Sequence, residues 1–163
     1  LDVLLKVSRL TNIKYTRQQA KLSASNVLPQ SYTKLHGAVS SLMRRGDSTT
    51  EFPAICMACG LCLDASGKGL CTAHARKCCG DGGAFFLVQD CIVLLLHGPR
   101  ASYFGPLYLD VHGERHRNHR GKPLNLNTKM VEHLRKLWAS HGIPREVVLK
   151  RSTSTRVIIN SHY

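Results

Sequence analysis

The sequence predicts an α+β fold in which a β-hairpin or short sheet packs on helices. Two apolar, β-prone runs at residues 84–88 and 91–96 predict the hairpin. Amphipathic patterns that follow Pro29 and Asn127 predict the two principal helices. Residues 47–83, which lie between the first helix and the hairpin, are rich in glycine and cysteine and are predicted to be loops without a core of their own. At 163 residues and 43% apolar composition, the chain has the size of one ordinary domain.

The N-terminal part of the chain predicts one short helix, a linker and one longer helix. Residues 1–10 have the spacing of a helix that is buried on one side, and residues 11–27 have the polar composition of a linker. Pro29 suits the first turn of the next helix, because the missing N–H costs nothing there, and Gly46 is a suitable stop. The apolar face of this helix is predicted to contain Tyr32, Leu35, His36, Val39, Leu42 and Met43.

The C-terminal part predicts a third strand, a helix and a basic tail. Residues 103–109 are the third candidate strand, and Asn127 or Thr128 can cap the helix. The apolar face of that helix is predicted to contain Met130, Val131, Leu134, Leu137, Trp138 and His141, and Gly142 and Pro144 end it. Residues 145–163 are basic and rich in Ser and Thr, and they are predicted to be an edge strand or disordered. The predicted division is a helix and linker at 1–27, a central domain at 28–142 and a tail at 143–163.

The net charge of +13 lies on the two flanks of the chain. Residues 1–50 carry eight Lys and Arg against two acids, and residues 111–163 carry eleven against three. Residues 51–110, which hold every cysteine, carry four against five and are close to neutral. Basic flanks favour nucleic acid or an acidic protein surface as a partner, although a solvated face without a specific partner is an equal alternative. The sequence shows neither a membrane span nor a secretory signal pattern.

The cysteine spacing predicts a structural zinc site. Two pairs, Cys56 with Cys59 and Cys71 with His74, each have two intervening residues and can each supply two corners of a tetrahedron. Gly60 follows the first pair directly, which suits a turn around a metal. Seven cysteines within residues 56–91, an odd number, argue against a disulfide framework. The complete fold prediction is therefore a small zinc-stabilised α+β domain.

Two alternative residue pairs could serve as the second pair of ligands. Cys79 could join His74 in place of Cys71, so the candidate metal ligands are Cys56, Cys59, Cys71, His74 and Cys79. Cys62 and Cys91 are predicted not to bind metal, and Cys91, at the start of an apolar run, is predicted to be packed. No candidate catalytic residue is predicted, because the sequence has no nucleophile elbow, phosphate-binding loop or paired carboxylates.

Several segments, taken in order, resemble the C-terminal cap of UBR-type (N-recognin) E3 ubiquitin ligases. Residues 53–60, PAICMACG, resemble the first knuckle of that family, and residues 71–87 resemble its C-x-x-H…C-G-x-G stretch. Residues 108–114 and 120–124 resemble its Y-L-D…G-E and R-G-x-P-L segments, and the helix at 134–141 follows. The resemblance covers residues 28–142. The family usually has another Cys pair before the first knuckle, whereas residues 44–52 contain no cysteine, so one zinc ion is expected.

The resemblance implies an accessory module of a large ligase of the N-degron pathway, in the cytoplasm and also the nucleus. Other domains of the same ligase would bind the ubiquitin-charged E2 and the N-degron substrate, and this segment would not be catalytic alone. The alternative is a small basic zinc module that binds RNA or DNA, which predicts aromatic side chains among Lys and Arg on an exposed face. The sharpest basic cluster is a loop containing His112, Arg115, His116, Arg117, His119 and Arg120, and it is predicted to be solvated or to contact an acidic surface.

Overall fold

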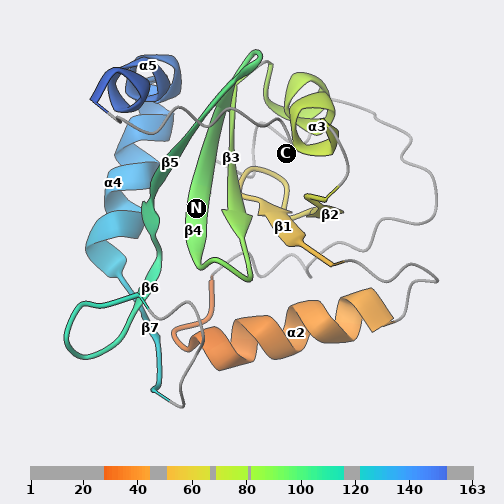
Figure 1. Ribbon diagram of the computed structural model, residues 1–163, viewed down its shortest axis with the longest axis vertical. Coiled ribbons are helices and arrows are strands. Elements are labelled where there is room, and N and C mark those ends of the chain that lie inside the picture. Colours follow the sequence, from red (N-terminus) through yellow and green to blue (C-terminus); the bar gives the residue numbers. More distant parts are fainter. Residues whose placement is uncertain (1–27, 45–50, 67–68, 81, 116–121, 154–163) are drawn as a thin grey trace.

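Five antiparallel strands form the central sheet, in the order β2-β1-β3-β4-β5 (Figure 1). The computed structural model describes residues 28–44, 51–66, 69–80, 82–115 and 122–153. The strands of this sheet are β1 (Pro53–Cys56), β2 (Cys62–Asp64), β3 (Gly82–Leu87), β4 (Ile92–His97) and β5 (Arg100–Pro106). A separate two-stranded sheet pairs β6 (Tyr108–Leu109) with β7 (Asn125–Leu126). The helices in the described ranges are α2 (Tyr32–Arg44), α3 (Leu70–Cys79), α4 (Thr128–Ala139) and α5 (Ile143–Thr153). The α+β prediction is confirmed.

Both faces of the sheet are buried, because alternate residues of each strand enter different apolar clusters. Phe85 and Leu94 lie in one cluster, whereas their chain neighbours Phe86 and Leu95 lie in the other. The cluster around Phe86 also contains residues from α2, α4 and α5. The cluster around Phe85 contains residues of α3 together with the β1–β2 hairpin. The domain therefore has α3 on one face of the sheet and the other described helices on the opposite face (Figure 1).

The predicted hairpin is confirmed as β3 and β4, which pair from Gly82 with His97 to Leu87 with Ile92. The connection is longer than the two residues that the sequence suggested, because Cys91 has a φ of 52° and belongs to the turn, with its N–H bonded to the Val88 carbonyl at 3.3 Å. Cys91 is buried, as predicted. The third predicted strand is divided into β5 and β6.

The predicted absence of structure and core in residues 47–83 is wrong for the described part of that segment. β1 and β2 form a hairpin that extends the sheet, and residues 70–79 form a ten-residue helix. Ala54, Leu61 and Ala75 are among the residues that give this segment a buried apolar cluster. Burial thus stabilises the segment, and a metal would add to that stability without replacing a core.

The predicted edge strand or disorder of the tail is also wrong for its first half. Residues 143–153 form α5, and Ile143 and Val147 are buried in the cluster around Phe86. Pro144 therefore lies in the first turn of α5, where proline is well tolerated. The predicted N-terminal helix and linker at 1–27, and the end of the tail at 154–163, lie outside the described residues.

Two buried tyrosines attach the entry of α2 to the turn after β3 and to β6. The Tyr32 hydroxyl donates to the Val88 carbonyl at 2.7 Å, and the Tyr108 hydroxyl donates to the Pro29 carbonyl at 2.8 Å. Burial raises the pKa of both hydroxyls, so they remain protonated donors at neutral pH. The predicted apolar face of α2 is confirmed at Tyr32, Leu35 and Val39, which are buried.

We expect Asn127→Ala to lower the free energy of unfolding by about 1 kcal/mol. Asn127 is the N-cap of α4, and its side-chain oxygen accepts the Met130 N–H at 3.2 Å, which confirms the predicted cap. The matched control is Asn125→Ala, because the Asn125 side chain is exposed and caps no helix. Urea unfolding of the two variants should place the loss in Asn127→Ala only; equal losses would contradict the capping role.

Candidate metal centre

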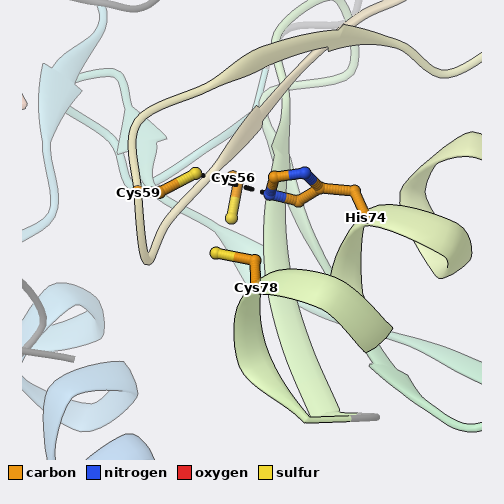
Figure 2. A group of neighbouring side chains, drawn as sticks. All are labelled: Cys56, Cys59, His74 and Cys78. Carbon is orange, nitrogen blue, oxygen red and sulfur yellow. Dashed lines mark hydrogen bonds between the residues drawn. The ribbon is translucent and has the colours of Figure 1, made fainter. Parts of the chain in front are cut away.

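Three cysteines and one histidine meet on the α3 face of the sheet. The ligand atoms of Cys56, Cys59, His74 and Cys78 all lie within 4.8 Å of one another (Figure 2). Zinc bonds of about 2.3 Å to sulfur and about 2.0 Å to nitrogen place the corners of a tetrahedron roughly 3.5–3.8 Å apart. The four atoms are therefore close enough to hold one metal ion. A donor set of three thiolates and one imidazole is typical of structural zinc sites.

The β1–β2 hairpin supplies two of these candidate ligands. Cys56 is the last residue of β1, and Cys59 lies in the turn that follows. Gly60 closes the turn with a φ of 74°, which favours glycine, and its N–H bonds to the Cys56 carbonyl at 2.8 Å. The Cys56 N–H bonds to the Leu61 carbonyl, also at 2.8 Å. This backbone brings the two sulfurs to one side of the hairpin (Figure 2).

The helix α3 supplies the other two candidate ligands. His74 and Cys78 are four residues apart, so their side chains project from the same face of the helix (Figure 2). Gly69 and Gly80 flank the helix, and Gly80 ends it in the left-handed conformation with a φ of 62°. The His74 ring also meets the Phe85 ring edge-on, with centroids 6.0 Å apart, which connects the ligand to the sheet.

Hydrogen bonds within the cluster shift the pKa values of its side chains in different directions. Hydrogen bonds with neighbouring cysteines, Cys56 first among them, hold the pKa of the Cys78 thiol far below its ordinary value. The pKa of Cys56 is raised, chiefly by its hydrogen bond with Cys59. Burial lowers the pKa of His74, but hydrogen bonds with Cys59 and Cys78 outweigh burial and raise that pKa to about 9. The His74 Nε2 and Cys59 Sγ atoms are 3.4 Å apart. A cation that binds here must therefore displace protons.

Three of the five predicted ligands lie in the cluster, and two lie outside it. Cys56, Cys59 and His74 are in the group of four, whereas Cys71 and Cys79 are outside it. Because residues 70–79 form a helix and not a knuckle, Cys71 lies two turns, or about 10 Å, along the helix axis from Cys78. Cys71 is fully buried in the apolar cluster around Phe85.

Cys78 is the residue that sequence reasoning missed. The sequence could have indicated it. Residues 70–79 contain no Gly or Pro and are bounded by Gly69 and Gly80, which allows a helix, and in a helix the four-residue spacing puts Cys78 on the same face as His74. Cys62 and Cys91, which were predicted not to bind metal, are buried in the opposite cluster, around Phe86.

The basic loop after β6 is described only in part. Asp110 organises its beginning, because its carboxylate accepts the N–H groups of His112 and Glu114 at 2.9 and 2.8 Å. Lys122 approaches the same carboxylate at 3.7 Å. His116, Arg117, His119 and Arg120 lie outside the described residues. None of the helices in the described ranges has the length and apolar character of a membrane span.

Comparison with known proteins finds one matching family model and several related E3 ubiquitin-protein ligases. Residues 17–140 match the model of a family described as Proteolysis_6 C-terminal. The chain is 33% identical over 150 residues to E3 ubiquitin-protein ligase UBR2 of Homo sapiens, which covers 83% of this chain and 8% of that protein. It is 33% identical to E3 ubiquitin-protein ligase ubr-1 of Caenorhabditis elegans, over 74% of this chain and 7% of the relative. It is 31% identical to E3 ubiquitin-protein ligase UBR1 of Saccharomyces cerevisiae, over 79% of this chain and 7% of the relative. The chain thus spans less than a tenth of the length of each of these relatives.

Proposed function

Because this chain belongs to the Proteolysis_6 C-terminal family, we propose that it is the C-terminal structural and assembly module of a UBR-type E3 ubiquitin ligase of the N-degron pathway. Its relatives are named as E3 ubiquitin-protein ligases, and this chain corresponds to a small part of each. Ubiquitin transfer and substrate binding belong, in this proposal, to other domains of the ligase. The ligase would act in the cytoplasm, and in the nucleus as well.

We propose further that the metal is Zn²⁺, held by Cys56, Cys59, His74 and Cys78. The observation that supports this most strongly is the mutual distance of at most 4.8 Å among three sulfurs and one ring nitrogen. Four protein ligands leave no open coordination position, so the ion would be structural and not catalytic. When bound, it would connect the β1–β2 hairpin to α3 and fix how this face of the domain is presented to the rest of the ligase.

The nucleic-acid alternative has less support from the described residues. It requires aromatic rings on an exposed basic face, where bases can stack. The aromatic residues Tyr32, Phe85, Phe86, Phe104 and Tyr108 are instead buried. Phe52 is 48% exposed, but it belongs to the nearly neutral middle of the chain.

The assembly role predicts that the isolated chain forms no ubiquitin conjugates with E1, E2, ubiquitin and ATP. Mixed with its ligase truncated to lack this segment, the chain should bind stably and co-elute in size-exclusion chromatography. The Cys56→Ser/Cys59→Ser variant should bind less well, because the metal-held face is no longer fixed. A chain that transfers ubiquitin alone, or that does not bind the truncated ligase, would contradict the role.

A further inference from the structure

Burial divides the four candidate ligands into two pairs. Cys56 and His74 are buried, with 0% and 4% of their surface exposed, whereas Cys59 and Cys78 are only partly buried. The two partly buried cysteines come from different elements. Cys59 lies in the turn between β1 and β2, and Cys78 lies in the last turn of α3 (Figure 2). Solvent therefore approaches the centre on the side where the hairpin and the helix each present one cysteine.

The Cys59 and Cys78 sulfurs are close enough to be joined by a small movement. They lie within 4.8 Å of each other, and a disulfide bond is about 2.05 Å long, so they need to approach by less than about 3 Å. Both residues stand at the ends of their elements, where a local shift disrupts few backbone hydrogen bonds. Cys56 is held more firmly, because it pairs with Phe85 of β3 and its N–H bonds to the Leu61 carbonyl.

The described cysteines outside the centre are mostly withdrawn from solvent. Cys62, Cys71 and Cys91 are buried, with 4%, 0% and 1% of their surface exposed. Cys79 is partly buried, like Cys78, but it is outside the group whose ligand atoms lie within 4.8 Å of one another. Cys79 is therefore a control of matched exposure for the chemistry of Cys78.

We propose that the metal centre is sensitive to oxidation: a peroxide joins Cys59 and Cys78 in a disulfide, and the metal ion is released. This inference rests on the proposed metal site. Zn²⁺ has no redox chemistry of its own, so the electrons come from the sulfurs that it holds as thiolates. Cysteines that respond to oxidants are accessible thiolates with a second thiol beside them. In a reducing compartment such disulfides are transient and act as signals.

The oxidation is balanced with hydrogen peroxide as the oxidant. The Cys59 thiolate attacks one peroxide oxygen, the O–O bond breaks, and Cys59 becomes a sulfenic acid while hydroxide leaves. The Cys78 thiolate then attacks the Cys59 sulfur, an S–S bond forms, the S–O bond breaks, and a second hydroxide leaves. Both hydroxides take a proton from solvent, and the two thiolates have lost the two electrons that the peroxide gains. The disulfide sulfurs are no longer thiolates, so only two of the four ligands remain for the ion.

Hydrogen peroxide added to the purified, zinc-loaded chain tests this directly. We expect release of the bound zinc, measured with a chromogenic indicator, and a loss of zinc affinity of at least about a hundredfold, which is the upper end of what one altered contact around a metal costs. Dithiothreitol should restore binding, because a disulfide is reducible and a sulfinic acid is not. Trypsin cleaves after Lys68 and Lys77, so mass spectrometry should find the peptides of Cys59 and Cys78 joined.

Cys79→Ser should release zinc and form the same disulfide, and circular dichroism monitors its fold. Zinc that stays bound in the oxidised chain would overturn the sensitivity to oxidation while leaving the metal site intact. So would release accompanied by a Cys56–Cys59 disulfide, which lies within one tryptic peptide, or by a disulfide that contains Cys79. A chain that binds no zinc before peroxide is added would instead overturn the proposed site itself. The peptide mapping of the unmodified chain depends on no substitution.

Discussion

Replacing Cys56 and Cys59 together by serine should abolish metal binding and lower the melting temperature of the purified chain by about 10 °C. A ligand that binds only the folded state stabilises it by about 4 kcal/mol when free ligand exceeds Kd a thousandfold. A domain of this size loses roughly 2–4 °C per kcal/mol, which gives the expected drop. The variant should stay folded, because the two apolar clusters on either side of the sheet remain. Metal analysis and differential scanning calorimetry measure the two effects.

A strong chelator separates the effect of losing the metal from any effect of the two substitutions themselves on the melting temperature. It should lower the melting temperature of the unmodified chain toward that of the variant and leave the variant unchanged. Cys62→Ser is the matched control for placing a hydroxyl at a buried cysteine, since Cys62 is buried in the opposite cluster and lies outside the centre. Unchanged metal content and unchanged melting temperature in the double variant would refute a structural metal in this domain.

The second large effect is expected from Phe85→Ala, which should both destabilise the fold and weaken metal binding. Phe85 is fully buried, and truncation of a buried Phe costs about 3–5 kcal/mol. Its ring contacts His74, and it also lies 3.0 Å from the position of a Cβ added to Gly83, where α3 and β3 pack closely through Ala75. Removing the ring therefore leaves α3 and its two ligands less well positioned.

Phe86→Ala is a closely matched control, because Phe86 is the next residue of β3, equally buried, and points to the opposite face. It should lose a similar 3–5 kcal/mol in urea unfolding. Its metal affinity, measured by competition with a chelator below the unfolding transition, should stay unchanged, whereas that of Phe85→Ala should fall. Equal metal affinities in the two variants would mean that the sheet does not position the ligands of α3.

The sequence predicts the elements that have a regular apolar period or a clear cap. The hairpin of β3 and β4 and the cap at Asn127 are in this class. The unbroken apolar runs 84–88 and 91–96 also indicate strands that are covered on both faces, as the two clusters show.

The elements that the sequence did not predict depend on contacts with distant residues. In α3 only Cys71, His74 and Ala75 are buried, so the helical period of its apolar residues is weak. The glycines on either side of it favoured a loop interpretation. α5 places only Ile143 and Val147 in the core, and its basic composition resembles a tail.

The choice between adjacent Cys78 and Cys79 depends on helix register, because one residue rotates a side chain by about 100° around the axis. Spacing rules for knuckles do not include that rotation. Which of two adjacent cysteines in a helix can bind a metal is therefore assigned only once the register of that helix is known.

The strand order also bears on the path by which the domain folds. β3, β4 and β5 follow one another directly and pair with their neighbours in sequence, so they can associate without closing a long loop. β1 and β3 are separated by residues 57–81 along the chain, so their pairing closes a longer loop. We expect this meander to form early and the β1–β3 pairing to form late. The four ligands would then come together only at the end of folding, so that metal uptake reports completion of the native topology.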